Sequence, residues 1–434
     1  MFRSLTQRDL EVIWHPYTQH KNMIPPVPIV RASGALLYDE TGNGYVDAIS
    51  SWWVNLHGHA HPFIAEKIYE QAQKLEHVIF TGFTHEPAVL LAERLLAILP
   101  GTFSKVFYSD NGSTAVEVAI KMAIQYWKNM EKTNGKKTRR KKILAFNHAY
   151  HGDTFGAMSV SSRSAFTQSF TDYLFEVAFI DPPTNENIDE LKSFIQNDSD
   201  EIACIIYEPL LQAAGGMLIY EAACLDSLLE AAKSFDIIRI ADEVLTGFGR
   251  TGKLFAGDYL RSKADIVCLS KGLTGGTMAM GVTACTAKIF NAFFDDDRSK
   301  TFFHGHSFTA NPIACAAALA SLDLLEREDC KERIDKIGAR HSAFVKEFNR
   351  VQPHEAERVR QLGTVLAFDL KDIETGYMSQ LSKMVTANAM RNGIYLRPLG
   401  NTVYIMPPYC IEDQQLDKLY DYLSSLPTEF NHSK

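Results

Sequence analysis

The sequence predicts an α/β protein, with a large domain built on a mostly parallel sheet and a smaller α+β domain after it. From about residue 60 to 320, short apolar runs rich in β-branched residues alternate with stretches of helical periodicity. This alternation is typical of a parallel sheet covered on both faces. After about residue 320, two helical stretches precede three short strands, which indicates a separate unit. The chain of 434 residues is long enough for both.

The elements are expected in the following order. The first 55 residues are loop-rich and contain a hairpin-like stretch, ALLYDETGNGYVDAIS, in which Thr-Gly-Asn-Gly supplies the turn. KVFYSD predicts a strand that leads into the amphipathic helix STAVEVAIKMAIQYW. The other strands of the large sheet are expected in KILAF, IACIIYEP, IIRIADE, DIVCLS and GVTACTA. The last unit is expected to contain the helices ALASLDLLERE and RIDKIGARHSAFVKEFNRV and the strands TVLAFDL, IYLRPL and TVYIMPP.

These patterns divide the chain into three parts. Residues 1–55 form an N-terminal segment that is expected to pack with the small domain, residues 56–320 form the large domain, and residues 321–434 form the small domain. In open parallel sheets, ligands bind at the carboxyl ends of the strands. We therefore expect the functional residues directly after the strands of the large domain.

Composition argues against several kinds of partner. Lys and Arg number 44 against 52 Asp and Glu, so the net charge of −8 gives no support for a nucleic-acid or membrane partner. The basic stretch KKTRRKK is interpreted as a solvated loop. The seven cysteines are scattered without C-x-x-C spacing, which suits a reducing cytosol rather than a disulfide scaffold or a zinc site. There is no signal-peptide pattern and no run of about 18 apolar residues, so we expect a cytoplasmic protein.

One apolar strand ends on a lysine. DIVCLSKGLTGG places Lys271 directly after the strand, followed by Gly272, Gly275 and Gly276. A surface lysine in a turn explains this pattern, and so does a reactive amine at a ligand site. Other polar residues at strand ends would favour the reactive amine over the surface lysine.

Two further polar positions follow predicted strands. Asn111-Gly112-Ser113-Thr114 would present backbone N–H groups and hydroxyls at the positive end of a helix. These residues would form either a phosphate site or a plain N-cap. Asp242 ends another apolar strand, where a carboxylate needs a cation or hydrogen-bond donors. A structural ion pair or a helix cap is the alternative. Lys271 lies 29 residues after Asp242, which leaves room for a helical crossover and a strand that would bring both to one sheet edge.

Together these positions match the needs of one cofactor, pyridoxal phosphate. It has an anionic phosphate, a ring nitrogen that must stay protonated, and an aldehyde that forms a Schiff base with an amine. The helix start, the strand-end carboxylate and the strand-end lysine would serve these three groups.

The sequence resembles the class III aminotransferases of fold type I. The resemblance rests on SDNGSTAVEVAIKMA, YHGDTFGAMSV, IIYEP, ADEVLTGFGRTGKLFA, LSKGLTGG and FFHGHSFTANPIACAAALA, which occur in the family's order and cover most of the chain. Within the family, WHPYTQ, SSWWVNLHGHAHP and LRPLGNTVYIMPPY are most similar to members that act in biotin synthesis.

The resemblance implies a role for each residue of the cofactor site. Lys271 is the Schiff-base lysine, and Asp242 pairs with the pyridinium nitrogen and keeps it protonated. Gly112 and Ser113 bind the phosphate. Tyr150 stacks on the ring and faces substrate.

Neighbouring positions are assigned less directly. His151 and Asp153 either support the cofactor site or only structure their loop, and Glu243 is expected to point away from Asp242 because strand residues alternate. The resemblance also implies that His306 and Ser307 contact the cofactor of a second subunit, and hence a homodimer. The family commonly has Thr where Ser307 stands; Thr309 lies two residues away from the matching position.

The resemblance also implies the substrate residues. Trp52 lines the pocket for a long aliphatic chain, although paired tryptophans are usually core residues. Arg397 binds a substrate carboxylate, Tyr17 stacks on the adenine of the donor, and Gly305 leaves room near substrate, alongside Tyr150 and Lys271.

The expected function is amino transfer from S-adenosylmethionine to 8-amino-7-oxononanoate. Arg250 is shared across class III and does not identify the substrate. EPLLQAAGG, which begins at Glu208, lacks the second Glu of ornithine and GABA aminotransferases. Lysine as the donor, another ω-amino acid aminotransferase and a cofactor-binding regulator without turnover are the alternatives.

Overall fold

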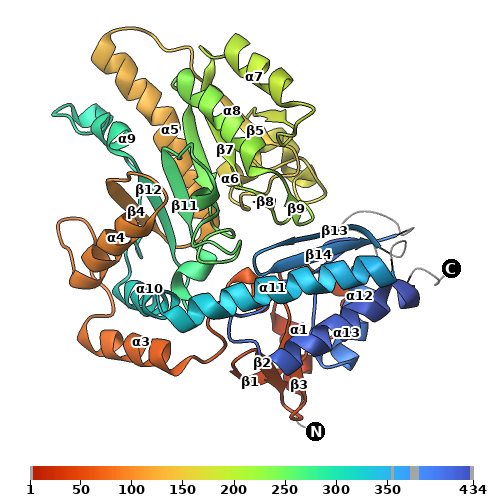
Figure 1. Cartoon of the computed structure of the whole chain (residues 1–434). Coiled ribbons are helices and arrows are strands. Elements are labelled where there is room, and N and C mark those ends of the chain that lie inside the picture. Colours follow the sequence, from red (N-terminus) through yellow and green to blue (C-terminus); the bar gives the residue numbers. More distant parts are fainter. Residues whose placement is uncertain (1–2, 353–355, 372–380, 431–434) are drawn as a thin grey trace.

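A central sheet with helices on both faces forms the core of the molecule (Figure 1). The computed structural model describes residues 3–352, 356–371 and 381–430. Within these ranges, seven strands form the central sheet in the order β4-β12-β11-β10-β7-β5-β6. Their bounds are β4 (Lys105–Ser109), β5 (Lys142–Phe146), β6 (Ala178–Ile180), β7 (Ile202–Tyr207), β10 (Ile238–Asp242), β11 (Ile266–Leu269) and β12 (Gly281–Cys285).

The remaining elements surround this sheet or form the region around both chain ends. The helices are α1 (Leu5–Val12), α2 (Ser50–Trp53), α3 (Pro62–Lys74), α4 (Glu86–Ile98), α5 (Gly112–Asn134), α6 (Phe155–Ser159), α7 (Ile188–Asn197), α8 (Ala222–Ser234), α9 (Ala287–Asn291), α10 (Pro312–Leu325), α11 (Glu328–Val351), α12 (Leu381–Arg391) and α13 (Asp413–Phe430). The 3-10 helices are η1 (His20–Asn22), η2 (Gln168–Tyr173), η3 (Ala256–Tyr259), η4 (Lys271–Thr274) and η5 (Arg298–Lys300). The other strands are β1 (Ile29–Ser33), β2 (Leu36–Asp39), β3 (Gly44–Asp47), β8 (Leu211–Gln212), β9 (Leu218–Ile219), β13 (Ala356–Leu362), β14 (Val365–Leu370), β15 (Ile394–Tyr395) and β16 (Thr402–Ile405).

The central sheet is mostly parallel, as the sequence predicts. β6, β5, β7, β10 and β11 pair in parallel, and every residue of β7 and β10 is buried. Strands covered on both faces read as continuous apolar runs, which explains why these stretches show little alternation. β12 is the exception and runs antiparallel to both β11 and β4. The connection at 270–280 contains only η4, and it is shorter than the crossover that a parallel pair requires.

Helices cover the two faces of the sheet (Figure 1). α5 packs on one face with Ile143 of β5, whereas α7 and α8 pack on the other with Leu144 of the same strand. Successive residues of one strand thus serve opposite layers. The predicted face of α5 is buried, with Val116, Ile120, Ala123 and Trp127 inside the core.

The connection from β10 to β11 differs from the predicted helical crossover. Residues 243–265 contain turns and η3 rather than an α-helix. Gly249 and Gly252 have φ angles of +98° and +96°, a conformation that a helix does not contain and that side-chain-bearing residues rarely adopt. These turns bury Arg250, whose guanidinium donates hydrogen bonds to two backbone carbonyl groups from other parts of the chain.

The N-terminal segment and the region after α11 share a sheet. β1, β2 and β3 pair antiparallel, confirming the predicted hairpin, and β15 joins β3 in parallel, with Ile394 opposite Val46. The predicted strand IYLRPL is therefore only partly correct, because just β15 is extended and it does not pair with β14 or β16. Pro398 cannot donate to a ladder and helps to end the strand. The domain boundaries given above stay a prediction.

The basic stretch KKTRRKK and the cysteines have ordinary structural surroundings. Arg139 pairs with Glu201, and Arg140 lies 4.3 Å from the centre of the Trp127 ring, so KKTRRKK is partly anchored rather than wholly solvated. Six cysteines are buried, and Cys410 is half-buried. No helix among the described residues has the length and apolar character needed to cross a bilayer.

Candidate active site

Two predicted site residues meet at one edge of the central sheet. Asp242 is the last residue of β10, and Lys271 follows the end of β11. These strands are parallel neighbours, with Asp242 opposite Cys268, so their carboxyl ends lie side by side. Both side chains line one cavity of about 440 Å³, hereafter the first cavity. Its position and volume are typical of a small-molecule site in an open α/β sheet.

The lysine occupies a strained backbone position beside this cavity. Lys271 has a φ angle of +43°, in the left-handed region that is uncommon for residues other than glycine and frequent at functional sites. Its amine lies 4.9 Å from the centre of the Trp53 ring. Burial lowers the pKa of the Lys271 amine, while the Asp242 and Glu208 carboxylates act in the opposite direction. A lowered pKa leaves more of the amine neutral and nucleophilic, so Lys271 is not an ordinary surface lysine.

The Asp242 carboxylate is held by two donors. The Val244 N–H donates to Oδ1 at 3.0 Å, and the His151 Nδ1 lies 2.7 Å from Oδ2. Because a carboxylate accepts hydrogen bonds, the network assigns the imidazole proton to Nδ1. The Nε2 atom of His151 is buried without a hydrogen-bond partner within the described ranges. His151, which the sequence left between a supporting and a loop-structuring role, thus contacts Asp242 directly.

A second carboxylate lines the same cavity. Glu208 is buried after β7, where it accepts hydrogen bonds from the N–H groups of Tyr150 and Ala213, both at 3.1 Å. Burial raises its pKa to about 7. Glu208 is absent from the site residues that the sequence predicts, where the motif that begins at Glu208 only excludes other relatives. The rule that selected Asp242, a carboxylate at the carboxyl end of a buried parallel strand, would also have selected Glu208.

The start of α5 forms another wall of the first cavity. The Asn111 side chain accepts from the Thr114 N–H at 2.9 Å, so Asn111 is the N-cap that the alternative interpretation required. Gly112 and Ser113, the first two helical residues, line the cavity. A Cβ at Gly112 would lie 2.8 Å from a Val244 methyl group, so a larger residue here would require the Val244 side chain to shift. The positive end of this long helix is suited to an anion.

A second cavity of about 300 Å³ shares Tyr150 and Lys271 with the first. The predicted substrate residues Tyr17, Trp52 and Arg397 all line this second cavity. They come from the stretch between α1 and η1, from α2 and from the stretch after β15. The fold therefore brings together residues that the sequence separates by up to several hundred positions.

The contacts in the second cavity combine apolar walls with the guanidinium of Arg397. The Tyr17 hydroxyl lies 3.1 Å from that of Tyr150 and also donates to the Asp153 carboxylate. The Tyr17 and Trp52 rings meet edge to face at 5.6 Å. The Arg397 guanidinium carbon lies 4.8 Å from the centre of the Trp52 ring. This arrangement suits a substrate with an aliphatic chain and a carboxylate.

Three predicted residues do not reach the two cavities of their own chain. Gly305, His306 and Ser307 lie between η5 and α10 and line neither cavity. The Thr309 hydroxyl donates to the His306 carbonyl at 2.8 Å and closes a local turn. A role for His306 and Ser307 at the cofactor site of a second chain stays a prediction.

The first cavity satisfies the requirements of pyridoxal phosphate. The helix start at Gly112 and Ser113 matches the phosphate, the carboxylate of Asp242 matches the protonated ring nitrogen, and the amine of Lys271 matches the aldehyde. The unpartnered Nε2 of buried His151 shows that this polar wall has capacity for a further hydrogen bond within the described residues.

Comparisons with known proteins agree with this fit. The model of the class III aminotransferase family matches residues 17–426. The chain is 43% identical to the adenosylmethionine-8-amino-7-oxononanoate aminotransferase of Synechococcus elongatus, with 96% of this chain and 98% of the relative covered. The enzyme of the same name from Helicobacter pylori is 39% identical, with 96% and 95% covered.

Solved structures show the same fold. The crystal structure of the adenosylmethionine-8-amino-7-oxononanoate aminotransferase from Methanocaldococcus jannaschii superposes with a TM-score of 0.90 at 37% identity, and 98% of each chain is covered. An omega transaminase from Pseudomonas jessenii reaches the same TM-score at 24% identity, with 99% of each chain covered. The predicted fold class is confirmed by these neighbours.

Proposed function

The chain belongs to the class III aminotransferases, which depend on pyridoxal phosphate, and from this premise we propose that it transfers an amino group from S-adenosylmethionine to 8-amino-7-oxononanoate. The product is 7,8-diaminononanoate, and the pathway is biotin biosynthesis. We place the reaction in the cytoplasm.

The observation that carries this proposal is the composition of the second cavity. Trp52 supplies a large apolar wall, Arg397 supplies a cation, and Lys271 lies at the boundary with the first cavity. An acceptor with a keto group, an aliphatic chain and a terminal carboxylate fits this order of groups. The Tyr17 ring adds an aromatic face that suits the adenine of the donor.

In this proposal the first cavity holds the cofactor. Gly112 and Ser113 would hold the phosphate, Asp242 would pair with the ring nitrogen, Tyr150 would pack against the ring, and Lys271 would present its amine to the aldehyde. When bound, the cofactor supplies a carbonyl that accepts the donor's amino group and a ring that withdraws electrons from the reacting carbon.

The side chains of the protein move and hold protons. The Lys271 amine would move a proton to and from the reacting carbon atoms, and its lowered pKa favours the neutral form that accepts a proton. Asp242 keeps the proton on the ring nitrogen, because a neighbouring negative charge favours the protonated form. Tyr150 remains a neutral hydroxyl, since burial raises its pKa. The buried Trp53 ring, 4.9 Å from the Lys271 amine, would keep water from this side of the amine.

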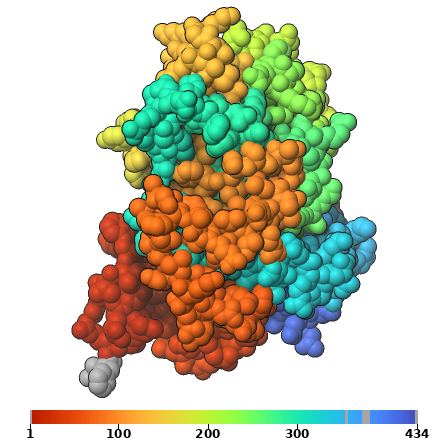
Figure 2. Space-filling model, turned by 90° about the vertical axis from the view of Figure 1, so that its left-hand side faces the viewer, coloured from red at the N-terminus to blue at the C-terminus, as the bar shows by residue number. Residues whose placement is uncertain are grey.

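We further propose that the active unit is a homodimer. Gly305, His306 and Ser307 would serve the cofactor and substrate of the partner chain. The same loop carries Phe303 and Phe308, which are 74% and 63% exposed. Figure 2 shows that the face bearing α3, α4 and α9 is formed by segments from distant parts of the sequence.

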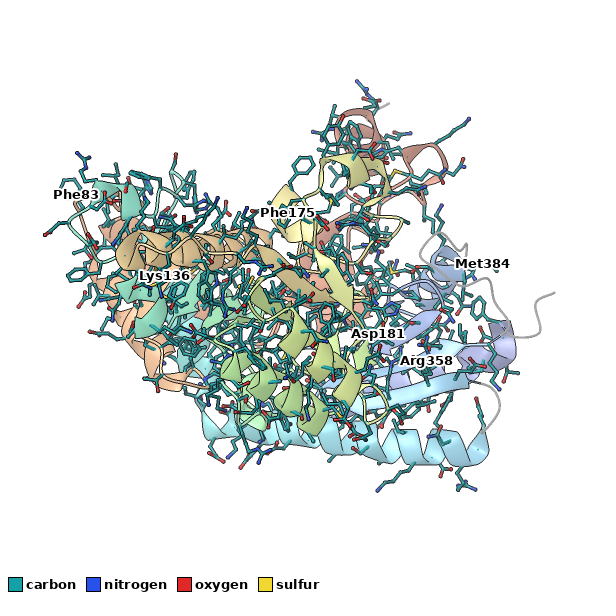
Figure 3. All side chains as sticks on the ribbon, turned by 90° about the horizontal axis from the view of Figure 1, so that it is seen from above. Phe83, Lys136, Phe175, Asp181, Arg358 and Met384 are labelled. Carbon is teal, nitrogen blue, oxygen red and sulfur yellow. The ribbon has the colours of Figure 1, made fainter. Side chains whose placement is uncertain are left out.

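Other large apolar side chains support this interface. Phe83 is 65% exposed and projects from one end of the molecule in Figure 3. Ile79 is 58% exposed, and Phe294 is 78% exposed. Large apolar side chains that gather on one face are typical of an association surface.

The alternatives differ in donor and acceptor. Lysine as the donor would leave the aromatic face of Tyr17 without a role. An ω-amino acid aminotransferase acting on pyruvate would not need the long apolar wall of Trp52. A regulator without turnover would not release product at all.

A donor screen with purified protein loaded with cofactor tests the proposal. S-adenosylmethionine and lysine are offered separately with 8-amino-7-oxononanoate, and pyruvate is offered as a competing acceptor. We expect diaminononanoate to form when S-adenosylmethionine is the donor and not when lysine is the donor. We also expect the absorbance of the bound cofactor to change from that of its aldehyde form to that of its amine form. The variant Lys271→Ala is the inactive control.

Two results would overturn the proposal. Faster turnover with lysine or with pyruvate would assign another substrate pair. Normal turnover by Lys271→Ala would remove the assigned role of this amine.

A further inference from the structure

The segment that carries the two tryptophans is strained. Ser50, Ser51 and Trp53 have φ angles of +53°, +60° and +68°, all in the left-handed region. Ser51 combines its φ with a ψ angle of −92°, a conformation that is rare for a residue with a side chain. Residues in such conformations persist only where the surrounding structure holds them.

The strained turn sends two adjacent indoles to different partners. Trp53 is buried, donates from Nε1 to the Tyr404 hydroxyl at 2.9 Å, and places its face 4.9 Å from the amine of Lys271. Trp52 is 43% exposed and has the guanidinium of Arg397 4.8 Å from the centre of its ring.

One buried carboxylate accepts hydrogen bonds from the backbone of this turn. Asp47 accepts hydrogen bonds from the N–H groups of Ile49 at 3.2 Å and Ser51 at 2.6 Å. The His59 Nε2 lies 2.9 Å from the same Asp47 oxygen that Ser51 contacts. The Asp47 side chain is fully buried and lines neither cavity. Its carboxylate therefore affects the site indirectly, through the groups that it holds.

We propose that Asp47 is a positioning residue that holds the Ser50–Trp53 turn in its strained form and so fixes Trp52 and Trp53 against their partners. His59 keeps the carboxylate in place by donating to it. The effect on acceptor affinity described below rests on the proposed function, whereas the geometry of the turn does not.

A matched pair of variants tests the proposal. Asp47→Asn keeps the shape of the side chain but turns an NH₂ group or a weaker acceptor toward the donors of the turn. Asp39→Asn is the control, because buried Asp39 likewise accepts from two backbone N–H groups, those of Thr41 and Asn43, both at 2.9 Å. Asp39 caps the hairpin between β2 and β3 and lines neither cavity.

Two measurements on the loaded enzyme separate positioning from general stability. We expect Asp47→Asn to change the near-ultraviolet circular dichroism of the tryptophans, two of whose four members lie in the turn. We expect it to raise KM for the acceptor about tenfold, with a smaller change in kcat. Asp39→Asn should lower the urea midpoint without either change.

A glycine at position 51 provides a second test. Glycine adopts positive φ angles readily, so Ser51→Gly removes the strain that Asp47 has to oppose. We expect Asp47→Asn combined with Ser51→Gly to recover most of the dichroism and of KM. A purely structural contribution of Asp47 would instead give additive effects in this cycle. If Asp47→Asn alone does not fold, recovery of folded protein by Ser51→Gly gives the same support.

The proposal is wrong if Asp47→Asn behaves like Asp39→Asn in dichroism and KM. It is also wrong if Ser51→Gly fails to offset Asp47→Asn in dichroism or folding. If the unmodified enzyme does not use 8-amino-7-oxononanoate, the proposed function fails, but the dichroism and the double-variant cycle still decide the role of Asp47.

Discussion

His151 Nδ1 and Asp242 Oδ2 lie 2.7 Å apart, and both side chains are buried. The pair leaves Asp242 as a hydrogen-bond acceptor whose orientation is set by an imidazole on one oxygen and by the Val244 N–H on the other. A carboxylate that is oriented in this way is prepared for a cationic ring before the ring binds.

The first prediction concerns this pair. We expect His151→Ala to lower kcat about 10-fold to 100-fold and to weaken cofactor binding, because Asp242 loses the donor that orients it. His151→Asn, which can place an N–H donor near the position of Nδ1, should recover part of both losses. Turnover and cofactor titration of the apoenzyme measure them. Equal losses in the two variants would contradict the role of the hydrogen bond.

The second prediction concerns Arg397. We expect Arg397→Lys and Arg397→Gln to raise KM for 8-amino-7-oxononanoate about 10-fold to 100-fold, as the loss of a hydrogen bond to a charged group predicts. Lysine cannot reproduce the planar guanidinium that lies over Trp52, so it should rescue little. Steady-state kinetics with the acceptor and with an analogue without the carboxylate provide the measurement. An equal effect on the analogue would show that Arg397 acts through the wall of the cavity instead.

The sequence predicts the strand-end residues because the rule behind them is local. Asp242 and Lys271 each follow a short buried run, and parallel neighbours bring such positions to one edge. The same rule applies to Glu208. What the sequence does not specify is the direction of β12, since an apolar run of this length is compatible with both directions.

Other parts of the site depend on distant contacts. β15 pairs with β3, more than three hundred residues away in the sequence, and nothing in IYLRPL indicates this partner. Asp47 stands at the end of a hairpin strand where a solvent-exposed residue would be equally natural. Only the folded chain shows that its oxygens meet the Ser51 N–H and the His59 ring.

The third prediction is a pH dependence that comes from His57. This residue is buried, its Nε2 lies 3.0 Å from the Ser321 hydroxyl, and burial lowers its pKa from 6.5 to about 3. The unfolded chain therefore takes up a proton below pH 6.5 that the folded chain does not. His57 contributes stability that is fully present above pH 6.5 and is lost as the pH falls towards 3.

A neutral substitution isolates this contribution. Between pH 6.5 and pH 5, the free energy of unfolding should fall by roughly 1–2 kcal/mol less for His57→Gln than for the unmodified protein. Urea unfolding at both pH values measures this difference. The comparison between variants is needed because burial raises the pKa of Glu208 and Glu243 to about 7. Protonation of these two carboxylates stabilises the folded protein as the pH falls, which opposes the effect of His57. Parallel stability curves for the two proteins would show that His57 is not the source.

The fourth prediction concerns the close approach of two backbone segments at the first cavity. Gly276 has a φ angle of +83°, and a Cβ there would lie 2.8 Å from the carbonyl carbon and oxygen of Val54. We expect Gly276→Ala to lower the free energy of unfolding by roughly 2–5 kcal/mol, with ~1–2 kcal/mol from the left-handed backbone and ~1–3 kcal/mol from overpacking.

Gly135→Ala is the control, because Gly135 has a φ angle of +65° but no atom within 4 Å of its Cβ position, so only the backbone contribution of ~1–2 kcal/mol applies. Urea unfolding of both apoenzymes provides the measurement, and equal losses would mean that the contact with Val54 relaxes without cost. Because Gly276 also lines the first cavity, its variant alone should bind the cofactor more weakly.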